Sequence, residues 1–99
     1  MNQIRLLAAA RQDQLEAVDW YKRISPDLAR RFLSAVCETL ETLARQPDRY
    51  PEIWPGTREA PVSRWPYCIY YKIGAGFVLI LAIYHCSRDM TTIRTRPGS

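Results

Sequence analysis

With 99 residues, the chain has room for one domain with a modest hydrophobic core. Hydrophobic residues make up 47% of it and charged residues 24%, which are ordinary values for a folded domain and argue against disorder. The net charge of +4 is too small to establish nucleic-acid binding. Twelve of the fourteen basic residues are arginines, which bind phosphate or carboxylate through two hydrogen bonds, although a G+C-rich genome would produce the same bias.

The three cysteines, Cys37, Cys68 and Cys86, are widely spaced and fit neither a zinc site nor a disulfide framework. We therefore expect reduced thiols in a cytosolic protein. Residues 4–10 are mostly apolar but too short for a secretion signal, and no run approaches the roughly 20 residues that cross a membrane. We expect a soluble, cytoplasmic chain that forms one domain over residues 1–99 and uses no metal or other cofactor.

The first half of the chain predicts a short strand followed by two helices. Residues 2–7 alternate as a strand, and helical spacing of apolar residues then extends to Ile24. The sequence Ser25-Pro26-Asp27 predicts a new helix, because it offers an N-cap serine, a proline at the first helical position and an acid in the first turn. This helix should end near Gln46, before Pro47. The break between the helices is so short that they must form a hairpin.

The second half predicts a loop and three strands. Residues 47–56 contain three prolines and a glycine, so we expect a loop, and residues 57–63 alternate weakly as a strand. Residues 64–89 hold two long apolar strands around the turn at 74–76. A three-residue turn would place one set of large side chains on a single face toward the helices: Tyr67, Ile69, Tyr71, Ile73, Phe77, Leu79, Leu81 and Ile83. A two-residue turn would shift this register.

The other face of the two strands is too apolar for open water. Its predicted members are Cys68, Tyr70, Lys72, Val78, Ile80, Ala82 and Tyr84. The chain offers no third layer to cover them, so we infer that another polypeptide does.

Residues 90–99 show no periodicity, and we expect a tail with partial mobility. The predicted fold class is α+β, with element order β-α-α-β-β-β and a helical hairpin on one face of a small, mostly antiparallel sheet.

His85, the only histidine, follows the last strand and could act as a general acid or base, or donate a hydrogen bond to phosphate. A structural role with a local hydrogen-bond partner is the alternative. Arg88 could form an anion-binding cluster with Arg58 and Arg64, or pair with neighbouring groups. The serines stand in no nucleophile motif, and the glycines of 74–76 serve the turn and not a phosphate-binding loop.

The order and spacing of several short motifs resemble the toxin superfamily that contains the ParE and RelE toxins of bacterial type II toxin–antitoxin systems. The resemblance spans nearly the whole chain, and it points to the ParE-like, plasmid-stabilisation branch. The matching segments are W-Y at 20–21, S-P-D-L-A-R-R-F-L at 25–33, Q-P-D-R-Y-P at 46–51, G-T-R at 56–58, R-W-P-Y-C-I-Y-Y at 64–71 and A-I-Y-H-C-S-R-D at 82–89.

This resemblance implies a sheet with a helical hairpin on one face, and a ParD-like antitoxin that wraps and neutralises the toxin. The antitoxin would supply the cover that the second sheet face needs, so its expected contacts are the seven residues of that face. No membrane partner is implied.

Two activities exist among the relatives that the chain resembles. RelE-type toxins cleave mRNA on the ribosome with basic side chains on the sheet, whereas ParE-type toxins inhibit DNA gyrase. Cys68 and Cys86 stand where RelE-type toxins tend to carry cations, and no tyrosine follows Tyr84. A ribonuclease without metal must stabilise developing charge on phosphate, and each lost donor costs roughly 10²-fold. The resemblance therefore implies a gyrase inhibitor; a ribosome-dependent mRNA endonuclease is the alternative, and a domain that only binds antitoxin is a third.

The two activities predict different site residues. For a gyrase inhibitor, the residues expected to contact gyrase or its DNA complex are Arg64, Arg88, Arg94 and Arg96. For a ribonuclease, the expected catalytic set is Tyr84, His85, Arg58, Arg64 and Arg88.

Overall fold

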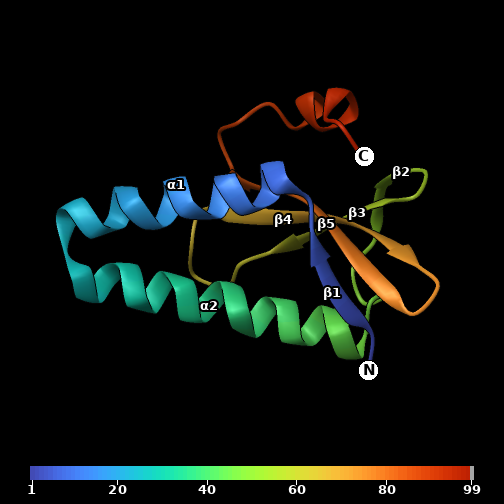
Figure 1. The fold of residues 1–99 in the computed structure, drawn as a ribbon, viewed down its shortest axis with the longest axis horizontal. Coiled ribbons are helices and arrows are strands. Elements are labelled where there is room, and N and C mark those ends of the chain that lie inside the picture. Colours follow the sequence, from blue (N-terminus) through green and yellow to red (C-terminus); the bar gives the residue numbers. More distant parts are fainter. Residues whose placement is uncertain (99) are drawn as a thin grey trace.

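The computed structural model describes residues 1–98; Ser99, the last residue of the predicted domain and tail, lies outside the described residues. A short strand, β1 (Gln3–Leu6), leads into α1 (Ala8–Ile24), and α2 (Pro26–Arg45) follows after a single residue. That residue is Ser25, whose hydroxyl oxygen accepts a hydrogen bond from the Leu28 N–H at 3.4 Å. The cap and the proline end one helix and start the next, so the predicted hairpin is confirmed (Figure 1).

Five strands form one sheet in the order β1-β5-β4-β3-β2. The strands after the helices are β2 (Glu52–Trp54), β3 (Thr57–Pro61), β4 (Tyr67–Gly74) and β5 (Phe77–His85). β1 runs parallel to β5, and the other pairs are antiparallel. This confirms the α+β class and the predicted element order. The three-residue strand β2 is an addition, because it lies inside the region predicted to be a loop.

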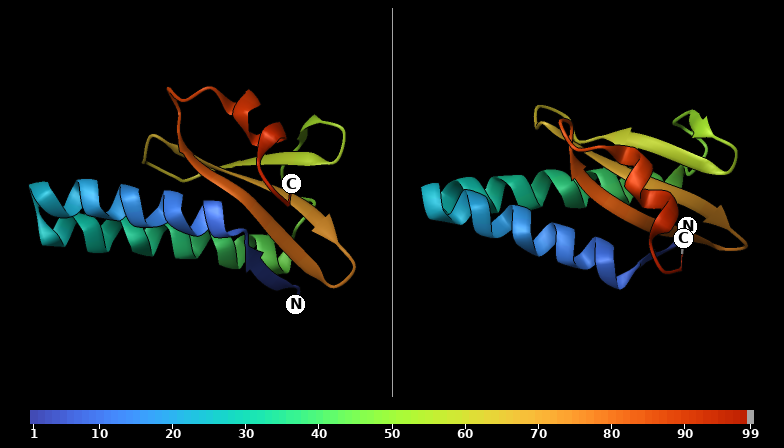
Figure 2. Two further views of the ribbon diagram at one scale, coloured as in Figure 1. Left: turned by 45° about the horizontal axis from the view of Figure 1, so that its top comes forward. Right: turned by 90° about the horizontal axis from the view of Figure 1, so that it is seen from above.

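The helical hairpin covers one face of the sheet, as Figure 2 shows, and the main core lies between these two layers. Apolar stripes on the helices supply one half of this core, and alternate residues of the strands supply the other. Its largest buried members are Phe32, Val36, Leu43, Val62, Tyr67, Ile69, Tyr71, Val78, Ile80 and Ile83.

The turn between β4 and β5 differs from the three-residue turn expected. Gly74 pairs with Phe77, so the turn has only two residues, Ala75 and Gly76, and Gly76 takes a positive φ of 77°. Further along, Tyr70 pairs with Ala82 whereas Tyr71 pairs with Ile80. One residue of β5, Leu81, therefore has no pairing partner and forms a β-bulge.

The turn and the bulge correct the predicted faces of β5. Because the turn is one residue shorter than expected, Val78 and Ile80 face the helices and are fully buried, whereas Leu79 and Leu81 belong to the other face. The bulge then restores the predicted alternation, so that Ile83 lies among the helix-facing residues. On β4 the prediction was correct for three residues, but Ile73 near the turn is 41% exposed.

The second face of the sheet is covered by the chain itself, which corrects the inference that only another polypeptide could cover it. The tail forms a 3₁₀-helix, η1 (Met90–Thr95), which lies over the face of the sheet opposite the helical hairpin (Figure 2). Its Ile93 packs into a second buried cluster with Leu81, Ala82 and Tyr84. Ile93 is only 1% exposed. A single tail side chain, Ile93, is enough to cover the cluster. Because one apolar residue makes no periodic pattern, the sequence did not predict a covering layer there.

Candidate functional site

Arg96, predicted to contact a target, is instead held inside the molecule by Asp13 of α1. Its Nη1 and Nη2 atoms each donate to one carboxylate oxygen of Asp13 at 2.8 Å, and Nη1 also donates to the Leu81 carbonyl at 2.9 Å. The side chain is 12% exposed, and the hydrogen bond to Asp13 raises the pKa of Arg96. Arg96 therefore anchors the tail to α1 and β5.

Asp13 is a structural residue that sequence reasoning missed. Its side chain is 6% exposed and also accepts a hydrogen bond from the Ile83 N–H at 3.0 Å. A signal was present, since Asp13 lies between Ala10 and Ala17 on the buried stripe of α1 at helical spacing. A carboxylate at such a position needs a partner inside the fold, although its spacing does not identify the partner.

Arg88 and Arg94 are each stacked on an aromatic ring and keep access to solvent. The Arg88 guanidinium lies 4.1 Å from the ring centroid of Tyr84, and its Nη1 is 3.9 Å from Asp13 Oδ1. The Arg94 guanidinium lies 4.5 Å from a ring centroid of Trp54. Stacking orients a guanidinium and leaves its edge able to bind an anion, so both arginines can meet a partner.

Among the four arginines predicted to contact a target, Arg64 has an unusual backbone conformation. It lies in a turn closed by a hydrogen bond of 3.0 Å from the Trp65 N–H to the Val62 carbonyl, and its φ is 71°. Glycine or asparagine is favoured in this region, and a residue with a longer side chain costs about 1 kcal/mol or more there. Such strain at an exposed residue suggests that its side chain has a use.

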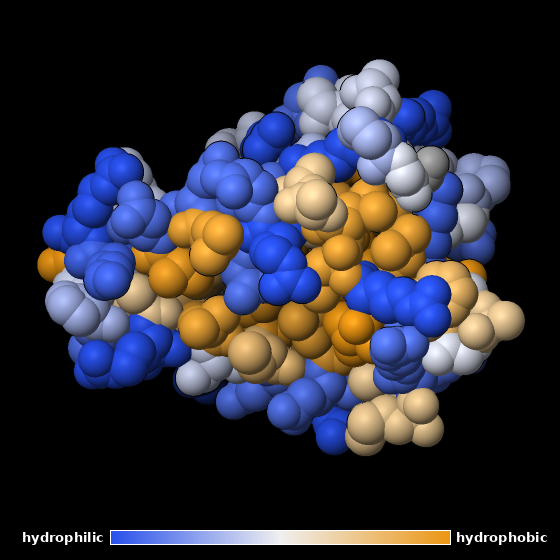
Figure 3. Space-filling model, viewed as in Figure 1, coloured by the Kyte–Doolittle hydropathy of each residue, from blue (hydrophilic) through white to orange (hydrophobic). Residues whose placement is uncertain are grey.

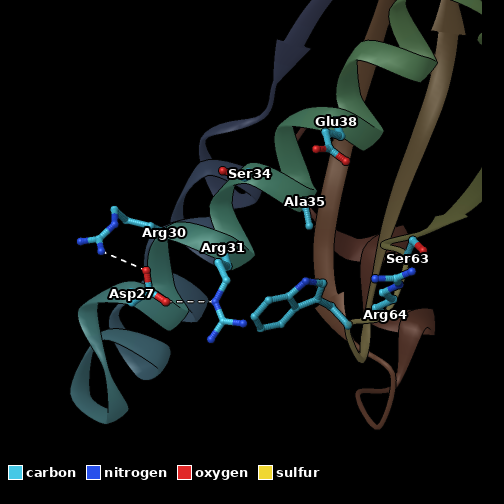
Figure 4. Close-up of a pocket in the computed structure, with 9 residues that line it drawn as sticks. Asp27, Arg30, Arg31, Ser34, Ala35, Glu38, Ser63 and Arg64 are labelled. Carbon is cyan, nitrogen blue, oxygen red and sulfur yellow. Dashed lines mark hydrogen bonds and ion pairs between the residues drawn. The ribbon is translucent and has the colours of Figure 1, made fainter.

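Arg64 lines an open groove of about 610 Å³ between α2 and the β3–β4 turn. We call this the arginine groove, and Figure 4 shows Arg30 and Arg31 on its helical side and Arg64 on the other. Its lining residues are Asp27, Arg30, Arg31, Ser34, Ala35, Glu38, Ser63, Arg64 and Trp65.

The charges of the arginine groove are partly matched within the chain. Arg30 and Arg31 both pair with Asp27, at 3.0 and 3.2 Å. These pairs are exposed and weakly held, so a phosphate or carboxylate group of a partner can compete for the arginines. The groove floor is rigid, because the Trp65 ring packs edge-on against Phe32 at 5.2 Å between centroids.

The five residues of the predicted ribonuclease set are divided among three places. Tyr84, His85 and Arg88 together line a cavity of about 260 Å³ beside Trp20, whereas Arg64 lines the arginine groove. Arg58 donates to the Tyr50 carbonyl at 2.6 Å and so holds the loop before β2.

The two groups of this set that could transfer a proton also have local partners. The Tyr84 hydroxyl is hydrogen-bonded to Thr92 Oγ1 at 3.0 Å, and Tyr84 is only 1% exposed. His85 Nδ1 accepts from the Ser87 N–H at 3.1 Å, which leaves the proton of a neutral ring on Nε2. This is the structural arrangement that the sequence left open as an alternative for His85.

The residues predicted to bind an antitoxin are mostly buried in this structure. Val78 and Ile80 face the helices, and Tyr70, Ala82 and Tyr84 lie under the tail, none of them more than 4% exposed. Of the predicted set, Cys68 and Lys72 keep partial exposure.

Three large apolar side chains that are well exposed lie on α1. Leu15, Trp20 and Ile24 are 57, 58 and 64% exposed. Figure 3 shows further apolar surface gathered where the start of α1 approaches β1, with hydrophilic residues around it. These helical surfaces are where a partner could bury apolar area without displacing the tail.

These elements define a class of small α+β domain: a helical hairpin on a mostly antiparallel sheet, with arginines at the rim. A family model described as the ParE toxin of the type II toxin–antitoxin system parDE matches residues 4–90. The chain belongs to this family and is therefore a toxin whose partner is an antitoxin.

One similar solved structure is described as the chromosomal ParDE TA system from P. aeruginosa. It is 22% identical, with a TM-score of 0.76, and the match covers 86% of this chain and 96% of that one. At this identity the likeness shows a shared fold. No curated protein sequence matches the chain closely enough to count as a relative. Within residues 1–98, no helix is both long and apolar enough to cross a membrane.

Proposed function

We propose that this toxin acts in the cytoplasm without catalysis, by binding DNA gyrase or its complex with DNA, and that a ParD-like antitoxin neutralises it. The observation that carries the proposal is the chemistry at Cys68 and Cys86. A toxin that cuts RNA without metal needs cations around the scissile phosphate, and this chain has thiols at the two positions, one on β4 and one directly after β5, where the resemblance to RelE-type toxins implies cations. The local partners of Tyr84 and His85 support the same conclusion.

The surface best suited to the target is the arginine groove, together with Arg88 and Arg94. Guanidinium groups bind DNA phosphates and protein carboxylates through paired hydrogen bonds. Arg96 is excluded from this surface because Asp13 holds it. The predicted target-binding set is therefore reduced to Arg64, Arg88 and Arg94, to which the groove adds Arg30 and Arg31.

Expressing the chain without its antitoxin tests the proposal. We expect double-strand breaks that depend on gyrase, measured by pulsed-field electrophoresis of chromosomal DNA. We also expect these breaks to induce an SOS response. The variant His85→Ala should be equally toxic, because no proton transfer is required. An intact chromosome combined with arrested translation would instead support mRNA cleavage, and loss of toxicity in His85→Ala would do the same.

Replacing Arg64 with glycine should separate function from stability. Glycine relieves the strained φ, so the free energy of unfolding should rise by about 1 kcal/mol in urea titrations. Toxicity should fall, because the groove loses the cation that lies opposite α2. The matched control is Arg64→Lys, which keeps the charge and the strain and should stay both toxic and unchanged in stability. A fully toxic Arg64→Gly variant would remove Arg64 from the target surface.

Most of the sheet face predicted to bind the antitoxin is buried, so another surface has to be considered for the antitoxin. The tail occupies the second sheet face, so we propose that the antitoxin covers the exposed apolar side chains of α1 and meets the sheet at Cys68 and Lys72. The exposure of Leu15, Trp20 and Ile24 supports this placement.

A further inference from the structure

Two thiols that are 18 residues apart in sequence lie side by side on the sheet. Cys68 belongs to β4, where it pairs with Tyr84, and Cys86 directly follows β5. The Cys86 N–H donates to the Pro66 carbonyl at 2.8 Å, so the pairing of the two strands continues to this residue. The two Sγ atoms are 4.0 Å apart.

This arrangement is close to the geometry of a cross-link. Residues two positions out of register on neighbouring strands share a face but lie diagonally, about 7–8 Å apart, and here both thiols turn toward each other, which brings their sulfurs to 4.0 Å. A disulfide bond is about 2.05 Å long, so the sulfurs need to approach by about 2 Å. Because a diagonal pair lies near the largest backbone separation that a disulfide spans, the segment after β5 also has to shift slightly toward β4. Cys86 is exposed and Cys68 is half-buried, so a reagent in solution reaches Cys86 first.

We propose that Cys68 and Cys86 form a reversible modification site, at which a low-molecular-weight disulfide such as glutathione disulfide oxidises the two thiols to an intramolecular disulfide. The reasoning rests on the placement of the two sulfurs and is independent of the toxin's target. The third cysteine, Cys37, lies on α2 and is exposed, so it provides an internal comparison.

The reaction proceeds in two exchanges and consumes one glutathione disulfide. The Cys86 thiolate attacks one glutathione sulfur; the bond between the two glutathione sulfurs breaks, and one glutathione leaves as a thiolate that takes a proton. The Cys68 thiol then loses its proton and attacks the sulfur of Cys86, which displaces the second glutathione. Two protein thiols are oxidised, and one disulfide is reduced to two molecules of glutathione.

The second exchange should limit the rate. Burial, together with the charge of Glu59 and the proximity of Cys86, raises the pKa of Cys68 to about 12. Burial and Glu59 remain once Cys86 carries glutathione, so the attacking thiolate stays scarce near neutral pH. Because its population grows tenfold for each pH unit below the pKa, ring closure should accelerate about tenfold from pH 7 to pH 8.

The cross-link would act on the segment that follows β5. It would tie Cys86, and with it the neighbouring His85 and Arg88, to the start of β4. Arg88 is one of the arginines proposed to meet the target, so oxidation would restrict a residue at the target surface. It would also withdraw Cys68 from the surface proposed for the antitoxin.

The test is mass spectrometry and thiol counting on the purified Cys37→Ser chain incubated with glutathione disulfide. We expect a loss of two hydrogen atoms in mass, no retained glutathione, and a fall from two titratable thiols to none. Treatment with dithiothreitol should restore both. The midpoint of thermal unfolding should rise by about 10 °C on oxidation, because the closed loop restricts the unfolded chain.

Two further variants, both made on the Cys37→Ser background, provide the controls. Cys68→Ser should stop at a glutathione adduct on Cys86, and Cys86→Ser should react more slowly, because its remaining thiol is half-buried. A Cys37→Ser chain that stops at a glutathione adduct, forms a disulfide between two chains, or keeps both thiols in excess oxidant would overturn the proposal.

Discussion

Replacing Asp13 with alanine is expected to lower the free energy of unfolding by about 3 kcal/mol, within the range for breaking a buried ion pair. The carboxylate of Asp13 accepts three hydrogen bonds, two from Arg96 and one from the Ile83 N–H, and its side chain is 6% exposed. Alanine would leave the Ile83 amide without this acceptor and deprive the Arg96 guanidinium of its carboxylate. Both groups would then be poorly solvated inside the fold.

Urea unfolding followed by circular dichroism measures this loss, and Asp19→Ala provides the matched control. Asp19 lies on the same helix and pairs with Arg23 at 2.8 Å, but both side chains are more than half exposed. That control should cost less than about 1 kcal/mol, because an exposed pair is already well solvated. Equal losses for the two variants would show that the contact between Asp13 and Arg96 adds little to the stability of the fold.

The same substitution should also loosen the tail. Arg96 ends the segment that begins with η1, and Ile93 is the side chain that η1 buries. Once the carboxylate is gone, the amide protons of η1 should exchange with solvent faster than they do in the unsubstituted chain, and this increase should exceed any increase in α2. Hydrogen–deuterium exchange measures both. The two outcomes are linked, because one carboxylate joins the tail to α1 and to β5.

Local chemistry made the first half of the fold predictable. Ser25 caps the first turn of α2 and Pro26 begins it, so both signals for the helix start lie next to each other in the sequence. The apolar spacing within α2 then specifies which of its residues are buried. The faces of β5 were less predictable, because a strand with apolar residues on both sides fits either register. One fewer residue in the turn and one extra residue at Leu81 then decide which side chains meet the helices.

The candidate site was predictable in composition but not in the role of each residue. Arginine content indicated an anionic partner, but the sequence does not distinguish Arg96 from Arg64. In the structure, Arg96 is largely buried, whereas Arg64 is exposed and lines the arginine groove. Arg96 pairs with a carboxylate 83 positions away, and no local pattern encodes that contact. The strained φ of Arg64 is equally hidden, because the turn has an arginine where glycine would be expected.

Replacing Phe32 with alanine is expected to cost about 4 kcal/mol, typical of removing a fully buried aromatic side chain. The Phe32 ring lies 4.9 Å from that of Tyr67, 5.0 Å from that of Tyr21 and 5.2 Å from that of Trp65. Its loss therefore leaves a cavity at the centre of an aromatic cluster. The cluster also supports Trp65, the neighbour of Arg64, so the arginine groove should lose its rigid floor.

The neighbouring residue on α2 provides the comparison for this prediction. Leu33 is only partly buried, so Leu33→Ala should cost less than half as much in urea unfolding. At a temperature where both variants stay folded, Phe32→Ala should also lose more toxicity, because the Phe32 ring packs against Trp65 of the groove floor. If Phe32→Ala lost stability as expected but kept full toxicity, the groove floor would not matter for the target. If its cost matched that of Leu33→Ala, the aromatic cluster would not be central to the core.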